Sequence, residues 1–350
     1  MRAMGRVPAP CLCRCLLTAA LMLSGRFAQA SVTCTVSPLP FPLWFSGTNR
    51  SAGGTAVTSP KTAPLTLVIL TVNGIEVRRV TPSPVQGQLP QVLGAVFDST
   101  NFQDGAPVTV RIWARNSLGE EGSAEATAPA CNKAYVYGNV LPDLGGIGTL
   151  LRGYDVANTL APRLQSARHT VTPATPTGAV NQRHDAIRAA IPPNTVFALY
   201  SHGDPGMLGD SATTNPGSGW VTAAQVASQV GAKTAQQPPC NFVFVDACSA
   251  GANDSLSVAF GTSTYGPYIQ DRAFVGWPRA MQDNDSLRDW TDRLFVALLT
   301  GKTVRDAVAD ADGGGKPLDW SGDPTDAAVF GDPDYKLRGV YLGAGLAFSR

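Results

Sequence analysis

The chain has 350 residues, of which 44% are hydrophobic and 15% charged, so it holds enough apolar material for two domains that each bury a core. This composition excludes a protein that is mainly disordered. The formal net charge is +1, and residues 1–30 carry four arginines and no acid, so the remainder is slightly acidic and offers no cationic surface for nucleic acid. The longest apolar runs reach about eight residues, well short of the roughly 20 that a membrane-spanning helix needs.

Residues 1–30 have the pattern of a secretory signal peptide. A basic start precedes the apolar stretch Leu16–Leu23, and Ala28-Gln29-Ala30 provides the small residues at which signal peptidase cuts. We therefore expect an exported protein, either secreted or located in the periplasm or at the cell surface. The alternative is an uncleaved anchor, although the apolar stretch is too short to span a membrane.

Four cysteines follow the signal peptide, and in an exported protein disulfide pairing is the default. Cys34 and Cys131 stand at the two ends of one β-rich region, so we expect them to form a disulfide. Cys240 and Cys248 flank an apolar run that would place their Cα atoms roughly 26 Å apart if it is a strand. A disulfide requires less than about 7 Å, so we expect at least one of this pair to be a free thiol.

Residues 31–131 are rich in Pro, Thr, Ser, Val and Gly and show no helical periodicity. Turn sequences such as Asn73-Gly74 separate the short β-type runs, at the spacing of a small antiparallel sandwich. We therefore predict an immunoglobulin-like β domain, acting as a spacer or folding partner, with a carbohydrate-binding or adhesive module as the alternative. The predicted strands are Leu65–Val72, Gly74–Val80, Val92–Phe97, Val108–Ala114 and Ser123–Ala128.

Residues 132–350 form a second predicted domain, in which strands alternate with helices. Such alternation favours an α/β fold with a mainly parallel sheet and helices on both faces. The predicted strands are Ala134–Gly138, His169–Val171, Thr195–Tyr200, Asn241–Val245 and Ala273–Trp277. The predicted helices are Ile147–Ala167, Asn181–Ile191, Thr222–Val230, Leu287–Leu299 and Thr303–Ala311.

Two polar segments follow two of the buried strands. Ser201-His202-Gly203 follows one strand and Asp246-Ala247-Cys248 the other. Ligands of open parallel sheets bind beyond the carboxyl ends of the strands, and glycines there let the backbone approach a substrate closely. An imidazole, a thiol and backbone N–H groups in one cleft are what a thiol nucleophile requires. We therefore interpret His202 and Cys248 as a catalytic pair, whereas either residue alone would be an ordinary turn histidine or core cysteine.

These two segments resemble the catalytic signature of the caspase-like cysteine peptidases, the group that contains caspases, metacaspases, legumains, clostripain and gingipains. The order, a His-Gly before an Asp-Ala-Cys-Ser-Ala-Gly with one helix between them, is typical of that group, and the resemblance covers roughly residues 134–340. Val329–Asp334 also resembles a Gly-Asp-Pro segment of gingipain-type domains. The resemblance implies a caspase-like fold and peptidase activity on a peptide or protein substrate. We expect no cofactor and no metal.

The resemblance also implies a role for each residue. Cys248 would attack the scissile carbonyl, His202 would protonate the leaving amine, and the N–H groups of Gly203 and Cys248 would form the oxyanion hole. Asp246 stands where metacaspases and clostripain carry the acid that receives a basic P1 side chain, the residue before the scissile bond, which favours Arg or Lys there. Two points weaken this preference: Asp246 could simply cap the turn after its strand, and legumains carry an acid there yet prefer asparagine.

Other functions remain open on the sequence alone. The chain could be an inactive caspase-like surface or adhesion protein, or a transpeptidase in which an amine captures the thioacyl intermediate. The acidic clusters Asp283–Asp285 and Asp310–Gly313 lack the oxygen ligands of an EF-hand, so we expect solvated loops rather than calcium sites. We also expect His169 and His184 to be solvated.

Overall fold

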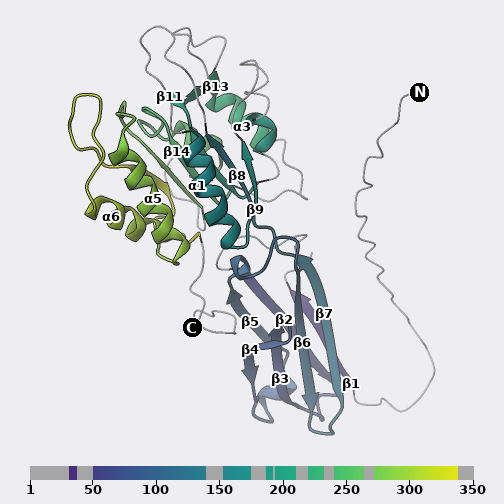
Figure 1. Ribbon diagram of the computed structural model, residues 1–350. Coiled ribbons are helices and arrows are strands. Elements are labelled where there is room, and N and C mark those ends of the chain that lie inside the picture. Colours follow the sequence, from purple (N-terminus) through teal and green to yellow (C-terminus); the bar gives the residue numbers. More distant parts are fainter. Residues whose placement is uncertain are drawn as a thin grey trace, which may run out of the picture.

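The structure, a computed structural model, describes residues 31–37, 50–138, 153–174, 187–191, 194–209, 220–231, 240–263 and 272–337. The predicted signal peptide, His184 and most of the predicted helix at 181–191 lie outside these residues. Figure 1 shows a module of β-strands, which also contains the 3-10 helices η1 (Gln86–Gln88) and η2 (Ser99–Asn101), followed by a module of strands and helices. Within the described part of the chain, no helix combines the length and apolar character needed to cross a membrane.

The first module consists of two antiparallel sheets that share one hydrophobic core. Alternation of buried and exposed side chains makes each strand amphipathic, as the ten residues of β6 illustrate by burying Val108, Val110, Ile112 and Ala114. Both sheets contribute to the core, which contains Phe97 from one sheet and these side chains from the other. The first sheet has the order β1 (Ser31–Ser37), β2 (Arg50–Ser59), β5 (Gln91–Phe97), and the second has the order β4 (Ile75–Val80), β3 (Leu65–Val72), β6 (Pro107–Asn116), β7 (Glu121–Pro129).

The expected disulfide between Cys34 and Cys131 is not formed. Cys34 is a free thiol on β1, and its Sγ donates a hydrogen bond to the carbonyl oxygen of Gly122 at 3.4 Å. Gly122 is the second residue of β7, whereas Cys131 lies just beyond the far end of that strand, nine residues or roughly 30 Å away. The strand pairing thus places Cys34 beside the first residues of β7, whereas Cys131 follows its last residue. The two thiols are therefore too far apart to form a disulfide. Burial raises the pKa of the Cys34 thiol to about 11.

The second module is built on a six-stranded sheet that is parallel except at one edge, as the alternating sequence predicts. Its central strand, β10, has the sequence VFALY, in which all five residues are buried, as both faces of the strand are covered by protein. The antiparallel edge strand is β16, which the sequence reading did not identify as a strand. The order is β16 (Ala328–Gly331), β15 (Ala273–Gly276), β14 (Phe242–Asp246), β10 (Val196–Tyr200), β8 (Lys133–Gly138), β9 (Thr170–Ala174).

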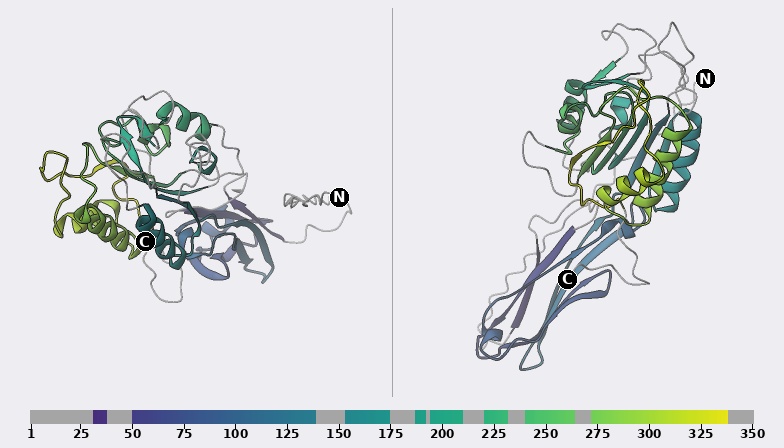
Figure 2. Two further views of the ribbon diagram at one scale, coloured as in Figure 1. Left: turned by 45° about the horizontal axis from the view of Figure 1, so that its top comes forward. Right: turned by 90° about the vertical axis from the view of Figure 1, so that its left-hand side faces the viewer.

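Helices cover both faces of this sheet (Figures 1 and 2), which makes three layers. One face packs against α1 (Gly153–Ser166), α5 (Asp285–Leu299) and α6 (Val304–Gly313). The other packs against a helical turn at 187–190, α3 (Ala223–Gly231) and α4 (Ser255–Ala259). Thr222 caps the N-terminus of α3, since its hydroxyl accepts a hydrogen bond from the N–H of Gln225.

A small antiparallel sheet follows the central strand, in a region for which the sequence patterns predicted no strand. It contains β11 (His202–Asp204), β12 (Met207–Gly209) and β13 (Trp220–Thr222). Pro205-Gly206 joins the first two strands, and Gly206 has a φ of +75°, a combination typical of a type II turn. His202 therefore lies on a strand of this sheet rather than in an irregular loop.

Of the polar side chains expected in solvent, Asp312 and His169 are held by the fold instead, whereas Asp310 stays exposed as expected. Asp310 and Asp312 lie in α6, where Asp310 forms an ion pair with Lys302 and Asp312 accepts a hydrogen bond from the Trp290 indole at 2.7 Å. His169 is buried, with 4% of its surface exposed. Tertiary packing decides these positions, because the sequence around each one is compatible with a surface loop.

Candidate active site

The two predicted catalytic residues follow the carboxyl ends of two neighbouring inner strands of the sheet. Strands β10 and β14 are parallel neighbours, with Tyr200 directly opposite Asp246. His202 and Cys248 each follow this pair by two residues along the chain. The N–H of Ser201 donates to the carbonyl oxygen of Asp246 at 3.2 Å, which extends the pairing one residue toward the two side chains.

Gly203 packs directly against the turn that carries Cys248. A Cβ atom built on Gly203 would lie 2.5 Å from the carbonyl oxygen of Cys248 and 2.8 Å from the Cβ of Ala247. Real Cβ atoms do not approach so closely, so only glycine fits here. The backbone beside His202 is thereby held in contact with the backbone of the cysteine turn.

The cysteine turn is held in place by the segment that follows β15. Cys248 Sγ accepts a hydrogen bond from the N–H of Met281 at 3.3 Å. Ser249 has a φ of +54°, an uncommon left-handed conformation, and its N–H donates to the carbonyl oxygen of Arg279 at 2.8 Å. Gly251 donates in the same way to Trp277, also at 2.8 Å. The Met281 N–H therefore contacts the sulfur directly, while the other two hydrogen bonds fix the backbone that follows Cys248.

A second set of contacts holds the segment that follows β15 in place. The buried carboxylate of Asp319 accepts hydrogen bonds from the N–H groups of Ser321 and Asp323, both at 2.9 Å, and from the Arg279 guanidinium at 3.0 Å. The N–H of Trp320 donates to the carbonyl oxygen of Ala280 at 2.8 Å. The turn at 319–323 thus braces the residues that touch Ser249 and the sulfur.

Burial favours the neutral form of both predicted catalytic side chains. It lowers the pKa of His202, an effect that the negative charge of Asp283 partly opposes. Burial also raises the pKa of the Cys248 thiol. The Met281 N–H lowers that pKa by donating to the sulfur, while the charges of Asp246 and Asp283 raise it further. A neutral imidazole can act as a general base toward a thiol.

Asp246, the predicted specificity residue, is 2% exposed and faces inward. One of its carboxylate oxygens accepts a hydrogen bond from the Trp277 indole at 2.9 Å, and the other accepts from the Thr291 hydroxyl at 3.4 Å. Both donors belong to the protein core, so this carboxylate ties β14 to the segment after β15 and to α5.

Asp283 is a residue of the site that the sequence reading missed. It was assigned to a solvated loop, but its carboxylate accepts a hydrogen bond from the Tyr200 hydroxyl at 2.5 Å. Tyr200 ends β10, two residues before His202. The only signal in the sequence is an acidic residue shortly after a buried strand, and this signal is too common to be informative. Among the described residues, no group of three or more His, Cys, Asp or Glu side chains is arranged to hold a metal ion.

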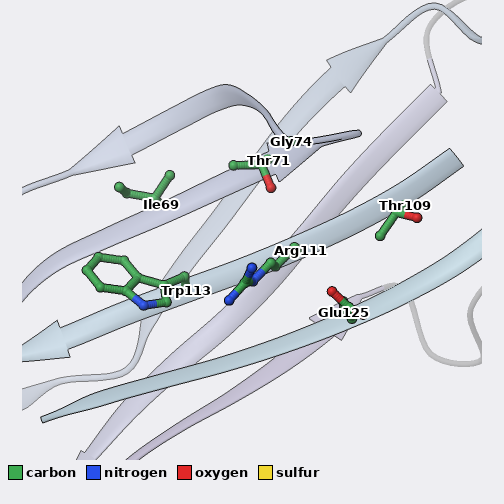
Figure 3. Close-up of a pocket in the computed structure, with 7 residues that line it drawn as sticks. All are labelled: Ile69, Thr71, Gly74, Thr109, Arg111, Trp113 and Glu125. Carbon is green, nitrogen blue, oxygen red and sulfur yellow. The ribbon is translucent and has the colours of Figure 1, made fainter.

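A shallow depression of about 460 Å³ lies elsewhere, on the four-stranded sheet of the β module (Figure 3). The indole of Trp113 and the guanidinium of Arg111 lie along β6 and Glu125 on β7, with Ile69 on the neighbouring β3. None of the predicted catalytic residues lines it.

Comparisons with known proteins establish no family for this chain. No family model matches the sequence, and no curated protein matches it. Among solved structures, one described as pro-sf-caspase-1 is similar, with 12% sequence identity and a TM-score of 0.37, over 57% of this chain and 91% of the other. This score is too low to carry an argument about fold or function, so any functional assignment rests on the geometry of the site.

Proposed function

We propose that this protein is an exported cysteine endopeptidase that uses Cys248 and His202. The observation that carries the proposal is the register of β10 and β14, which places an imidazole and a free thiol two residues beyond a directly paired position. The close packing of Gly203 against the Cys248 carbonyl supports it, because it keeps the two turns in contact.

The proposed reaction follows from the neutral state of both side chains. His202 takes the thiol proton as Sγ attacks the scissile carbonyl carbon, and the N–H groups of Gly203 and Cys248 stabilise the developing oxyanion. His202 then gives this proton to the leaving amine as the C–N bond breaks, which leaves a thioester on Cys248. Water, deprotonated by His202, attacks the thioester and releases the acid and the thiol.

Two further parts of the proposal concern specificity and the first module. A carboxylate at the site favours Arg or Lys at P1, since a basic side chain would form a charge-assisted hydrogen bond with it. The first module would be an immunoglobulin-like sandwich acting as a spacer, because its strand orders 1-2-5 and 4-3-6-7 divide seven antiparallel strands between two sheets around one core.

The test is cleavage of fluorogenic peptides with Arg or Lys at P1 by the wild type, by Cys248→Ala and by Cys34→Ala. We expect Cys248→Ala to abolish cleavage and Cys34→Ala, which removes a thiol of the β module, to retain it. Unchanged cleavage by Cys248→Ala would disprove the assignment. Absence of cleavage by the wild type, together with no labelling of Cys248 by a thiol-reactive peptide, would identify an inactive caspase-like protein. Capture of an added amine in the product would identify a transpeptidase.

A further inference from the structure

Two carboxylates act on Cys248, and their surroundings differ. Asp246 is almost completely buried, and its two oxygens already accept hydrogen bonds from Trp277 and Thr291. An incoming guanidinium or ammonium group would have to reach it through the core and displace these donors. Moving an unpaired charge through apolar packing is costly, so Asp246 is poorly suited to receive a substrate side chain.

Asp283 is only half-buried and belongs to the segment that touches the nucleophile. Two residues before it, the N–H of Met281 bonds to Cys248 Sγ at 3.3 Å. Its own carboxylate is held by the hydroxyl of Tyr200, at the end of the strand that leads to His202. The carboxylate is thus tied to the strand that precedes His202 and belongs to the segment that bonds to Cys248 Sγ, and its charge acts on both His202 and Cys248.

We propose that Asp283, rather than Asp246, is the carboxylate that pairs with a cationic P1 side chain, and that this pairing also favours ionisation of the nucleophile. The proposal rests on the proposed peptidase function. The negative charges of Asp246 and Asp283 oppose ionisation of the Cys248 thiol to a thiolate. A guanidinium or ammonium group beside Asp283 cancels one of them, so a basic substrate promotes formation of its own attacking thiolate, whereas a neutral substrate does not.

The first experiment compares reporters that differ only in having Arg or its neutral analogue citrulline at P1. We expect Asp283→Asn to lower the ratio of kcat/KM for the Arg reporter to kcat/KM for the citrulline reporter about 10- to 100-fold, because only the Arg reporter loses a charge-assisted hydrogen bond. Asp246→Asn should change both reporters by the same factor, because it loosens the support of β14. If the ratio of Arg to citrulline cleavage falls in Asp246→Asn and not in Asp283→Asn, the proposal is wrong.

The second experiment needs no turnover and follows alkylation of Cys248 by neutral iodoacetamide as a function of pH, with the modified cysteine identified by peptide mapping. Removal of a nearby negative charge lowers the pKa of a thiol, so the profile of Asp283→Asn should shift to lower pH than that of the wild type. Asp285→Asn is the matched control, since Asp285 is strongly exposed, pairs with Arg288 and should leave the profile unchanged.

The two experiments separate failure of this proposal from failure of the peptidase assignment. If the wild type cleaves neither reporter, the proposed function fails, and the alkylation profiles still decide whether the Asp283 charge acts on the sulfur. If Asp283→Asn and the wild type have the same alkylation profile, the second part of the proposal fails whatever the cleavage results show.

Discussion

The contact between Gly203 and Cys248 shows how a single residue can determine the geometry of the site. Two features of the sequence, a His-Gly and a cysteine after buried strands, indicated the chemistry, but neither indicated that the two backbones touch. The 2.5 Å separation between a hypothetical Cβ at Gly203 and the Cys248 carbonyl oxygen makes any side chain at this position incompatible with the observed arrangement.

We predict that Gly203→Ala reduces peptidase activity by about two orders of magnitude, because a shift of about 1 Å at a reacting group has an effect of that size. The measurement is kcat/KM on an Arg reporter, with circular dichroism to confirm that the protein folds. Gly231→Ala is the control: a Cβ there meets no atom within 4 Å, and alanine favours the end of α3. Full activity in Gly203→Ala would show that the two turns are not held as described.

Among the elements, the segment between β15 and α5 is the one whose role was least apparent from the sequence. The residues from Trp277 to Met281 bond to the cysteine turn at three successive points, and the turn at 319–323 braces them. Sequence patterning identified the strand before this segment and the helix after it, since both have strong periodicity. It could not identify the segment itself, whose contacts are made by backbone atoms that any sequence could supply.

Asp319 should make the stability of this region depend on pH. The N–H of Asp323 and then the Arg279 guanidinium hold the pKa of its carboxyl below the usual range. Its contribution is therefore complete above the pKa of the unfolded chain, near 4, and is lost as the pH falls through the lower folded pKa. We predict that the free energy of unfolding of Asp319→Asn lies below that of the wild type at pH 6 and that the difference shrinks between about pH 4 and pH 2.

Chemical denaturation across this pH range is the measurement, and Asp285→Asn is a suitable control because that side chain is strongly exposed. A difference between Asp319→Asn and the wild type that stays constant with pH would show that the ionised carboxylate does not brace the turn.

At the scale of the whole molecule, Asn132 links the two modules. Its side-chain amide donates to the carbonyl oxygens of Ser99 at 3.2 Å and Phe102 at 2.8 Å, and its own carbonyl oxygen accepts from the N–H of Thr170 in β9 at 2.9 Å. The side chain is buried, so one residue satisfies polar groups of the β module while its backbone extends the sheet of the second module.

We predict that Asn132→Ala lowers the free energy of unfolding by about 1–3 kcal/mol, because it leaves two carbonyl groups with one hydrogen bond fewer at a buried position. Denaturant titration monitored by tryptophan fluorescence measures this change. Gln103→Ala, at an exposed position in the same loop, should have no measurable effect. Equal stability of Asn132→Ala and the wild type would exclude a structural role for this junction.

The sequence by itself determined the mainly parallel sheet, most of its strands and helices, and the presence of His202 and Cys248 after two buried strands. These features follow from local periodicity and from the preference of apolar runs for the protein interior. Both patterns can be recognised in a single amino-acid sequence. Only the tertiary structure decided that Cys34 faces Gly122 instead of Cys131, that Asp246 is enclosed by Trp277 and Thr291, and that Asp283 lies beside the site. Each of these depends on strand register or on contacts between residues distant in sequence, and neither is encoded in a local pattern.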